Sequence, residues 1–130
     1  MARMKSLNTT KLKAELDRVF SLYIRQKNAS SSGMVKCYTC NKIGHWKELQ
    51  NGHFLSRRHL ATRWDEDNCK CQCVACNIFG QGKQFEFGER LKKEIGENRV
   101  NMLLVKSRQT LKWSAIDYLE RIGHYKKFIK

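Results

Sequence analysis

Two Cys-x-x-Cys pairs most strongly constrain what this chain can fold into. They are Cys37-Tyr-Thr-Cys40 and Cys73-Val-Ala-Cys76, with residues 41–72 between them. Two intervening residues let both sulfurs of a pair point at one ion, and two such pairs complete the tetrahedral four-thiolate site that zinc prefers. In an intracellular chain the six cysteines are expected to stay reduced, which favours metal binding over disulfides. The spacing therefore predicts a structural zinc ion on these four residues.

Two further cysteines precede the second pair in the alternating segment Cys69-Lys-Cys71-Gln-Cys73. On a strand these three side chains face the same side. Because neither Cys69 nor Cys71 belongs to a Cys-x-x-Cys pair, we interpret both as small buried hydrophobes. A different or a second zinc arrangement that uses them remains the alternative.

The charge of the chain predicts a polyanionic partner. Lysine and arginine number 26 against 12 acidic residues, which gives a formal net charge of +14 over 130 residues. Such an excess favours non-specific attraction to phosphates with strong salt dependence. Hydrophobic residues make up 41%, enough for the core of one domain, so the charge does not predict disorder.

No apolar run approaches the roughly 18 residues of a membrane span, and Met1–Thr10 lacks the apolar stretch of a signal peptide. We therefore expect a soluble, intracellular protein with no membrane partner.

Periodicity and breakers divide the chain into three parts. Residues 1–33 are predicted to form a helix over about 8–27, with apolar residues on one face, followed by the polar linker Asn28–Gly33. Residues 34–83 hold all six cysteines and are predicted to form a small zinc-bound ββα core. Residues 84–130 are predicted to be a helical extension. The expected fold class is α+β, a small metal-bound core with flanking N-terminal and C-terminal helices.

Within these parts, the pattern predicts short strands near residues 34–38, 48–55 and 68–73 and a helix that starts after Cys76. Further helices are predicted over residues 85–95 and 99–106. The last helix is predicted to begin at Ser114, with Asp117 as its capping-box partner. Its predicted apolar stripe is Trp113, Ile116, Leu119, Ile122 and Phe128.

Three polar side chains lie beside the cysteine pairs. His53 falls on the predicted strand after the first pair, Asn68 precedes the second pair, and Asn77 directly follows Cys76. A zinc site would hold these elements in place, which makes a rigid frame for a second, catalytic metal site.

This order of motifs resembles the zinc-stapled HNH, or ββα-metal, nucleases. More narrowly, Asn51–Phe54 (Asn-Gly-His-Phe), Arg63–Asn68 (Arg-Trp-Asp-Glu-Asp-Asn) and Gln72–Asn77 (Gln-Cys-Val-Ala-Cys-Asn) are similar to the phage NinG/Rap recombination proteins. Trp113–Asp117 also fits the helical tail of that family, so the resemblance covers roughly residues 35–120. The phage endonuclease VII family shares the Cys-x-x-Cys-Asn ending, but its central segment matches less well.

The resemblance implies a branched-DNA endonuclease of phage recombination, active in the cytoplasm of a bacterial host. It implies structural zinc on the four paired cysteines and catalytic Mg²⁺ or Mn²⁺. His53 occupies the position of the first HNH histidine, the general base. Asn68 matches the middle asparagine, which holds the loop and orients that histidine, and Asn77 the last position, which binds the catalytic ion.

One position departs from the HNH pattern. Many HNH sites carry an aspartate or histidine ligand immediately before the base, where this chain has Gly52. Either His53 is itself a metal ligand, or His59, Asp65 or Asp67 supplies the missing contact.

The chemistry fits these residue types. A neutral imidazole, with an ordinary pKa of about 6.5, can take a proton from water at cellular pH. A hard cation held by oxygen ligands such as Asn77 can stabilise charge at phosphorus and on the departing 3′ oxygen. A closed four-thiolate zinc site cannot do this work.

Among the basic residues, Arg57, Arg58, Arg63 and Lys83 are the leading candidates for DNA phosphate contacts. A nuclease that cuts two strands symmetrically gains from a two-fold homodimer, for which the first and last helices are candidate interfaces. The rival interpretation is a non-catalytic zinc-containing DNA-binding accessory protein in recombination. An RNA-binding zinc protein is less favoured because the sequence shows no aromatic stacking motif.

Overall fold

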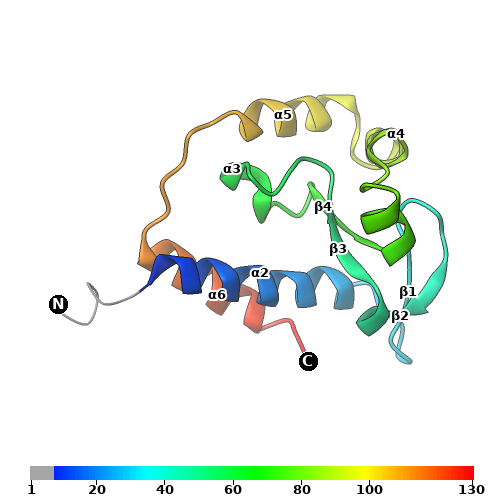
Figure 1. The fold of residues 1–130 in the computed structure, drawn as a ribbon, viewed down its shortest axis with the longest axis horizontal. Coiled ribbons are helices and arrows are strands. Elements are labelled where there is room, and N and C mark those ends of the chain that lie inside the picture. The colour runs from blue at the N-terminus through cyan, green and yellow to red at the C-terminus, as the bar shows by residue number, and fades with distance from the viewer. Residues whose placement is uncertain (1–7) are drawn as a thin grey trace.

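The structure is a computed structural model and describes residues 8–130. Residues 1–7 lie outside the described residues. They include the start of the predicted 1–33 segment and most of Met1–Thr10, the stretch that was compared with a signal peptide. The described chain is a mixed helical fold with two small antiparallel sheets (Figure 1). None of its helices combines the length and the apolar character that a membrane span requires.

Helix α2, Thr9–Gln26, confirms the predicted N-terminal helix. Asn8 is its N-cap, because the Asn8 side-chain oxygen accepts a hydrogen bond from the backbone N–H of Thr10 at 2.9 Å. One face of the helix is fully covered by the rest of the protein. It buries Leu16, Val19, Phe20 and Ile24.

The strands form two separate pairs. β1 (Met34–Lys36) pairs with β2 (Ile43–His45), and the 3₁₀ turn η1 (Trp46–Glu48) follows. β3 (Gln50–His53) pairs with β4 (Cys69–Gln72). The strands predicted near these positions are confirmed for β1, β3 and β4, whereas β2 was not predicted.

The register of β3 and β4 decides which side chains share a face. Gln50 lies opposite Gln72, and His53 lies opposite Cys69. Because side chains alternate along a strand, His53 and Cys69 share the face that packs on α2, where Cys69 joins the buried side chains of that helix. Gln50 and Gln72 share the other face, together with Gly52.

The remaining elements are helical. They are α3 (Leu60–Arg63), the five-residue π-helical turn η2 (Ala75–Phe79), α4 (Gln84–Ile95), α5 (Glu97–Ser107) and α6 (Ala115–Lys126). The last three confirm the predicted helices. η2 takes the place of the helix expected after Cys76, but it starts before that residue and ends at Phe79. α3 was not predicted.

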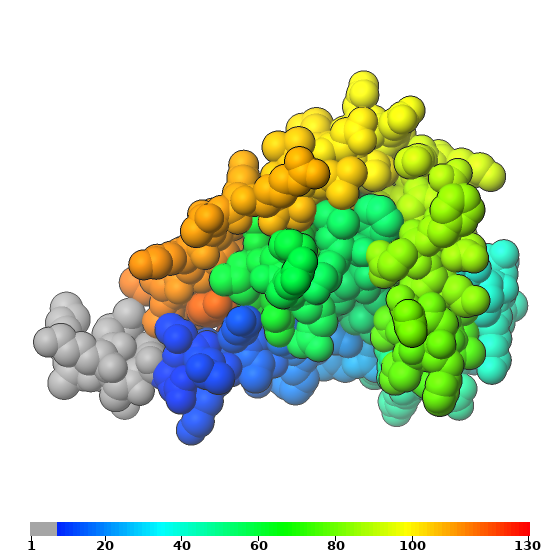
Figure 2. Space-filling view, turned by 45° about the horizontal axis from the view of Figure 1, so that its top comes forward, coloured from blue at the N-terminus to red at the C-terminus, as the bar shows by residue number. Residues whose placement is uncertain are grey.

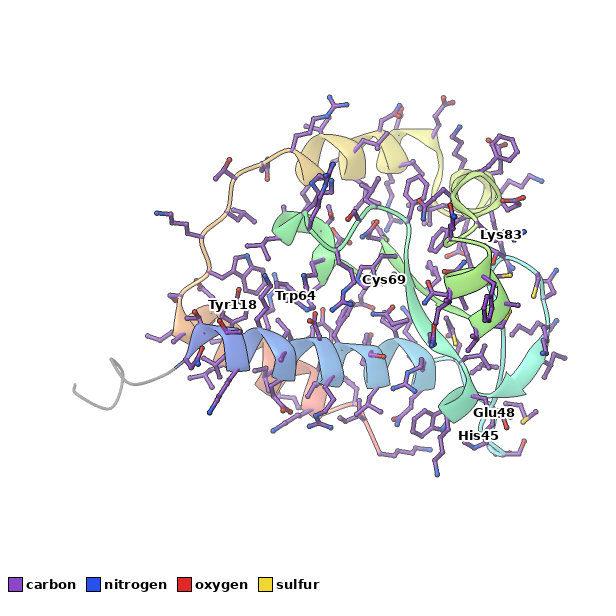
Figure 3. The ribbon with its side chains drawn as sticks, viewed as in Figure 1. His45, Glu48, Trp64, Cys69, Lys83 and Tyr118 are labelled. Atoms are coloured by element: carbon purple, nitrogen blue, oxygen red, sulfur yellow. The ribbon has the colours of Figure 1, made fainter. Side chains whose placement is uncertain are left out.

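The largest core, called here the helical core, joins the two ends of the chain. α6 packs along α2, and Trp64 and Cys69 fill the space beside them (Figures 1 and 3). In the space-filling view the green residues around α3 lie between blue α2 and the yellow-to-orange end of α5 (Figure 2). The helical core consists of Leu16, Val19, Phe20, Ile24, Trp64, Cys69, Tyr118, Ile122 and Tyr125.

The capping box at the start of α6 is confirmed: the Ser114 hydroxyl accepts from the Asp117 N–H, and the Asp117 carboxylate accepts from the Ser114 N–H. The predicted apolar stripe is largely wrong. Of its helical members only Ile122 is buried, together with two residues outside the stripe, Tyr118 and Tyr125. Tyr rings reach further toward α2 than aliphatic side chains do. The rings of Phe20 and Tyr125 pack edge-on, with their centres 4.9 Å apart.

The other members of that stripe are less buried. Ile116 is 51% exposed, Leu119 44% and Phe128 57%, and Trp113 is half-buried. The apolar face of α2, one of the two helices suggested for a homodimer interface, is covered by α6 within the same chain.

A second, smaller core surrounds the cysteine pairs and is called here the zinc-side core. It consists of Val35, Cys37, Leu49, Cys73 and Cys76. A third core joins the first cysteine turn to α4 and α5. It consists of Tyr38, Phe87, Leu91, Val100 and Leu103.

Candidate functional site

The four paired cysteines come together as predicted. The Sγ atoms of Cys37, Cys40, Cys73 and Cys76 all lie within 4.8 Å of one another, and those of Cys40 and Cys73 are 3.7 Å apart. Tetrahedral zinc with bonds of about 2.3 Å separates its sulfurs by about 3.8 Å. The group therefore has the spacing and the chemistry to hold one zinc ion.

A tight backbone turn positions the first cysteine pair, Cys37 and Cys40. The Cys37 N–H donates to the Lys42 carbonyl at 2.8 Å, and Asn41 turns the chain with a φ of +64°. Burial alone would raise the pKa of the Cys37 thiol. Hydrogen bonds from the backbone of Cys73 and from Thr39 outweigh burial and lower that pKa to about 6. These hydrogen bonds thus favour the thiolate of Cys37, the form that binds metal.

Cys69 and Cys71 lie outside the four-cysteine group. Cys69 is fully buried in the helical core, with its sulfur 3.5 Å from the carbonyl oxygen of Arg63. Cys71 packs, partly buried, against the zinc-side core, and burial raises the pKa of its thiol to about 12. Both environments suit small protonated side chains.

His53 is held at the end of β3 by one backbone contact. Its Nε2 lies 2.8 Å from the carbonyl oxygen of Arg63. A carbonyl only accepts, so Nε2 carries the hydrogen and Nδ1 keeps its lone pair. Burial lowers the pKa of the imidazole, assisted by the positive charges of Arg57 and Arg63 and opposed by the Arg63 hydrogen bond and by Asp17. The ring is therefore neutral at physiological pH.

Asn68 fastens the loop that follows β3. Its side-chain oxygen accepts from the Leu55 N–H at 2.7 Å, and its side-chain nitrogen donates to the carbonyls of Leu55 at 3.1 Å and Thr62 at 3.0 Å. The side chain is completely buried. These bonds give Asn68 the loop-holding geometry that the resemblance implies, and the held loop includes the segment that carries the Arg63 carbonyl.

Asn77 lies on η2, the turn that contains Cys76. Its side-chain nitrogen donates to the side-chain oxygen of Gln50 at 2.8 Å. This bond fixes the orientation of the amide and does not use the carbonyl oxygen, which is the atom that binds a hard cation.

His53 and Asn77 do not lie at the same end of β3. Asn77 contacts Gln50 at the start of the strand, and His53 is three residues further on, a path of about 10 Å along a strand. Alternation also directs the Gln50 and His53 side chains to opposite faces. A single ion bound directly to both His53 and Asn77 would require these elements to shift.

Gly52 faces a side chain that fills the space beside it. A Cβ at this position would lie 1.8 Å from the side-chain oxygen of Gln72. The fully buried Gln72 donates its amide N–H groups to the Thr39 hydroxyl at 3.0 Å and the Gly82 carbonyl at 2.9 Å. Within residues 8–130 its oxygen has no hydrogen-bond partner. A side chain at position 52 would therefore displace Gln72 from its present position.

Two of the three candidate replacement ligands are held in ion pairs. Asp65 forms an ion pair with Lys106 at 2.6 Å, and Asp67 forms one with Arg99 at 2.7 Å. Lys106 and Arg99 both belong to α5. His59 is the N-cap residue of α3, without a side-chain capping bond. Across the part of the chain that the structure describes, the four cysteines are the one group of three or more His, Cys, Asp or Glu ligands that gathers.

An acidic residue that the sequence did not single out organises the loop after β3. Asp17 of α2 accepts from the Arg63 guanidinium, from Arg57 at 3.0 Å and from the Trp64 indole N–H at 2.9 Å. Burial opposes ionisation, but these donors keep the pKa of Asp17 below its ordinary value. The partners lie 40–47 residues away, so no local pattern could have identified the contact.

The four basic residues predicted to contact DNA phosphates therefore differ in how far their side chains are exposed and free to bind. The Arg63 side chain is only 13% exposed and is used by Asp17 and by the Arg57 carbonyl, so it holds the loop instead of facing solvent. Arg57 is 58% exposed although it also pairs with Asp17. Arg58 and Lys83 are exposed.

The fold and its site define the class: a mixed helical protein with two small sheets and a four-cysteine group able to hold zinc. The family model described as Bacteriophage Lambda NinG protein matches residues 2–130, and the chain belongs to this NinG family. The match confirms the family resemblance seen in the sequence. No curated protein and no solved structure gives a significant match.

Proposed function

We propose that the chain is a metal-dependent endonuclease that hydrolyses phosphodiester bonds in branched recombination intermediates such as Holliday junctions or D-loops. The observation that carries the proposal is the neutral His53, oriented by the Arg63 carbonyl in a loop fastened by Asn68. In this proposal, β3, the loop, β4 and η2 take the places of the two strands and the helix of a ββα-metal (HNH) unit. Membership of the NinG family supports the phage recombination setting.

His53 acts in this proposal as the general base. Its unprotonated Nδ1 removes a proton from water, the resulting hydroxide attacks phosphorus, and the 3′ oxygen departs. The Nε2 hydrogen bond to Arg63 keeps the ring in the tautomer that this step needs. Because burial lowers the pKa of His53, the active neutral form persists below the ordinary histidine range.

The side chains near η2 suit a hard cation such as Mg²⁺ or Mn²⁺. Neutral amide oxygens are present there: that of Asn77 on η2, that of Gln50, which already accepts from Asn77, and the buried, unpartnered oxygen of Gln72. A site without a carboxylate needs DNA phosphate to balance the charge of the ion. For an ion bound there to stabilise negative charge at the phosphorus that the His53-activated water attacks, η2 and the end of β3 would have to move toward one another when DNA binds.

The test is cleavage of a synthetic four-way junction and of a linear duplex of equal length, each with Mg²⁺ or Mn²⁺. We expect metal-dependent cutting of the junction and a loss of about 10²–10⁴-fold in His53→Ala, with DNA binding retained. His124→Ala, on the exposed side of α6, is the matched control and should cut normally. Equal cutting of both substrates would remove the branch preference and keep the nuclease.

A second candidate is the non-catalytic zinc-containing accessory protein. The separation of His53 from Asn77 along β3 favours it, because the two side chains do not converge on one ion. Tight junction binding by the unaltered chain without cutting in either metal ion would establish this function instead.

A further inference from the structure

An open groove of about 500 Å³ lies away from Asn77, between the C-terminal end of α2, β1, β4 and α4. It was not among the predicted DNA contacts. Cationic side chains from four separate segments converge on its edges. They are Arg25, Lys27, Lys36, Lys70 and Arg90, and this site is called here the basic groove.

The floor of the basic groove is apolar. Ile24, Val35 and Cys71 line it together with the ring of Tyr38. The Arg90 guanidinium lies 4.4 Å from the centre of the Tyr38 ring, and the Lys70 ammonium 5.3 Å. These contacts hold two of the cations beside the aromatic side chain that lines the groove.

Positive charge exceeds negative charge in the groove. Glu94, the one carboxylate among the described lining residues, accepts from Lys70 at 2.8 Å and from the Tyr38 hydroxyl at 3.1 Å. Within residues 8–130 no carboxylate pairs with Arg25, Lys36 or Arg90.

Arg25 shows the imbalance most clearly. Its half-buried guanidinium is bonded only to neutral oxygens of Ser21 and Trp46, at 3.1–3.4 Å. Burial without a carboxylate lowers the pKa of its side chain. Because these cations have no carboxylate partner, an anionic ligand could pair with them.

We propose that the basic groove binds a single strand of DNA, with phosphates on the cationic edges and bases over the apolar floor. Proteins that bind single strands combine these two features. A site of about 500 Å³ suits one or two nucleotides. The inference rests on the proposed action on branched DNA, whose displaced or unpaired strands supply the ligand.

The test measures binding of a short fluorescein-labelled oligothymidylate to the zinc-loaded protein by anisotropy, over a salt series and without added Mg²⁺ or Mn²⁺. The variant is Lys36→Glu, since this side chain is exposed and makes no described ion pair. Lys112→Glu carries the same charge change and lies in the exposed segment between α5 and α6, at the far end of the molecule (Figure 1). Lys36→Gln removes the cation without adding an acid.

Lys36→Glu is expected to weaken binding at least about fivefold and to lower the slope of log affinity against log salt by about 0.7, the value for one single-strand phosphate contact. Lys36→Gln should lower the slope equally, and Lys112→Glu should change affinity less than about twofold. Equal effects of the two Glu variants would overturn the proposal. Unchanged DNA binding by Lys36→Glu would overturn it as well.

The experiments distinguish an incorrect groove proposal from an incorrect nuclease proposal. Binding is measured without the catalytic ion, so strand binding through Lys36 without junction cutting would keep the groove and overturn only the nuclease. Junction cutting with a Lys36→Glu variant that binds like Lys112→Glu would keep the nuclease and overturn only the groove.

Discussion

The zinc-side core and the helical core differ in the size of the side chains that they bury, and so in what can stabilise them. The zinc-side core has only small or medium buried residues and joins strands of three or four residues, too short to be stable by pairing alone. The helical core buries four aromatic rings, those of Phe20, Trp64, Tyr118 and Tyr125. A zinc ion on the four cysteines would thus supply stability that buried apolar area supplies in the helical core.

Loss of the zinc site is the largest expected effect. Cys73→Ser should abolish tight zinc binding, and structural zinc contributes apparent free energies of about 10–16 kcal/mol. Hydrogen exchange should show β1, β2 and η2 losing amide protection while α2 and α6 keep theirs. Cys71→Ser, two residues away and outside the cysteine group, is the control and should still bind one zinc. Equal loss of protection in α2 and α6 would show that the two cores unfold as one unit.

A cavity in the helical core should have the next largest effect. Phe20 is fully buried against Tyr125, so Phe20→Ala is expected to lower the free energy of unfolding by about 3–5 kcal/mol. Phe128→Ala removes a 57% exposed ring and should cost less than about 1 kcal/mol. Denaturant titration with zinc saturated measures both. Zinc content should be unchanged, and parallel loss of zinc would contradict the separation of the two cores.

Asp17 connects the helical core to the loop that holds His53, and its loss should have an intermediate effect. Asp17→Asn is expected to cost about 1–3 kcal/mol at pH 7, because charge-assisted bonds to Arg63 and Arg57 are weakened. The folded pKa of Asp17 lies below its unfolded value of about 3.9. Its contribution is therefore full above about pH 4 and is lost as the pH falls through the folded pKa.

The pH dependence supplies the check. The difference in unfolding free energy between the unaltered chain and Asp17→Asn should be constant near neutral pH and shrink as the solution is acidified below about pH 4. A difference that does not change on acidification would mean that Asp17 acts through packing and not through charge.

The smallest expected effect concerns the cap of α6. Ser114→Ala removes the side-chain half of the capping box and should cost about 0.5–2 kcal/mol. Thermal unfolding monitored by Trp fluorescence can detect it, since Trp64 and Trp113 lie beside α6. Ser114→Thr should restore most of the loss because its hydroxyl can make the same capping bonds. Failure of this rescue would assign the loss to another contact of Ser114.

Local signals in the sequence predicted the local features of the fold. The spacing of Leu16, Val19 and Phe20 and the Ser114–Asp117 pair specified α2 and the start of α6, because helix periodicity and capping depend on residues a few positions apart. The cysteine group was predictable because metal geometry limits the spacing within each pair.

Features set by distant partners were not predictable in this way. The choice of Tyr118 and Tyr125 over Ile116 and Leu119 depends on which side of α6 meets α2. The roles of Arg63 and Asp17 depend on a contact between residues far apart in the chain. Within the candidate site, sequence motifs selected His53, Asn68 and Asn77, but only the register of β3 showed how His53 and Asn77 are separated.

The close approach of Gly52 and Gln72 also predicts how related sequences can vary. Because a Cβ at position 52 would enter the space of the Gln72 side chain, the two positions should change together: an acidic residue at position 52 should be accompanied by a smaller residue at position 72. A designed pair, Gly52→Asp with Gln72→Ala, would test whether this face of the hairpin can exchange a buried amide for a carboxylate. The same trade would convert a neutral set of oxygens into a charged one without altering the backbone.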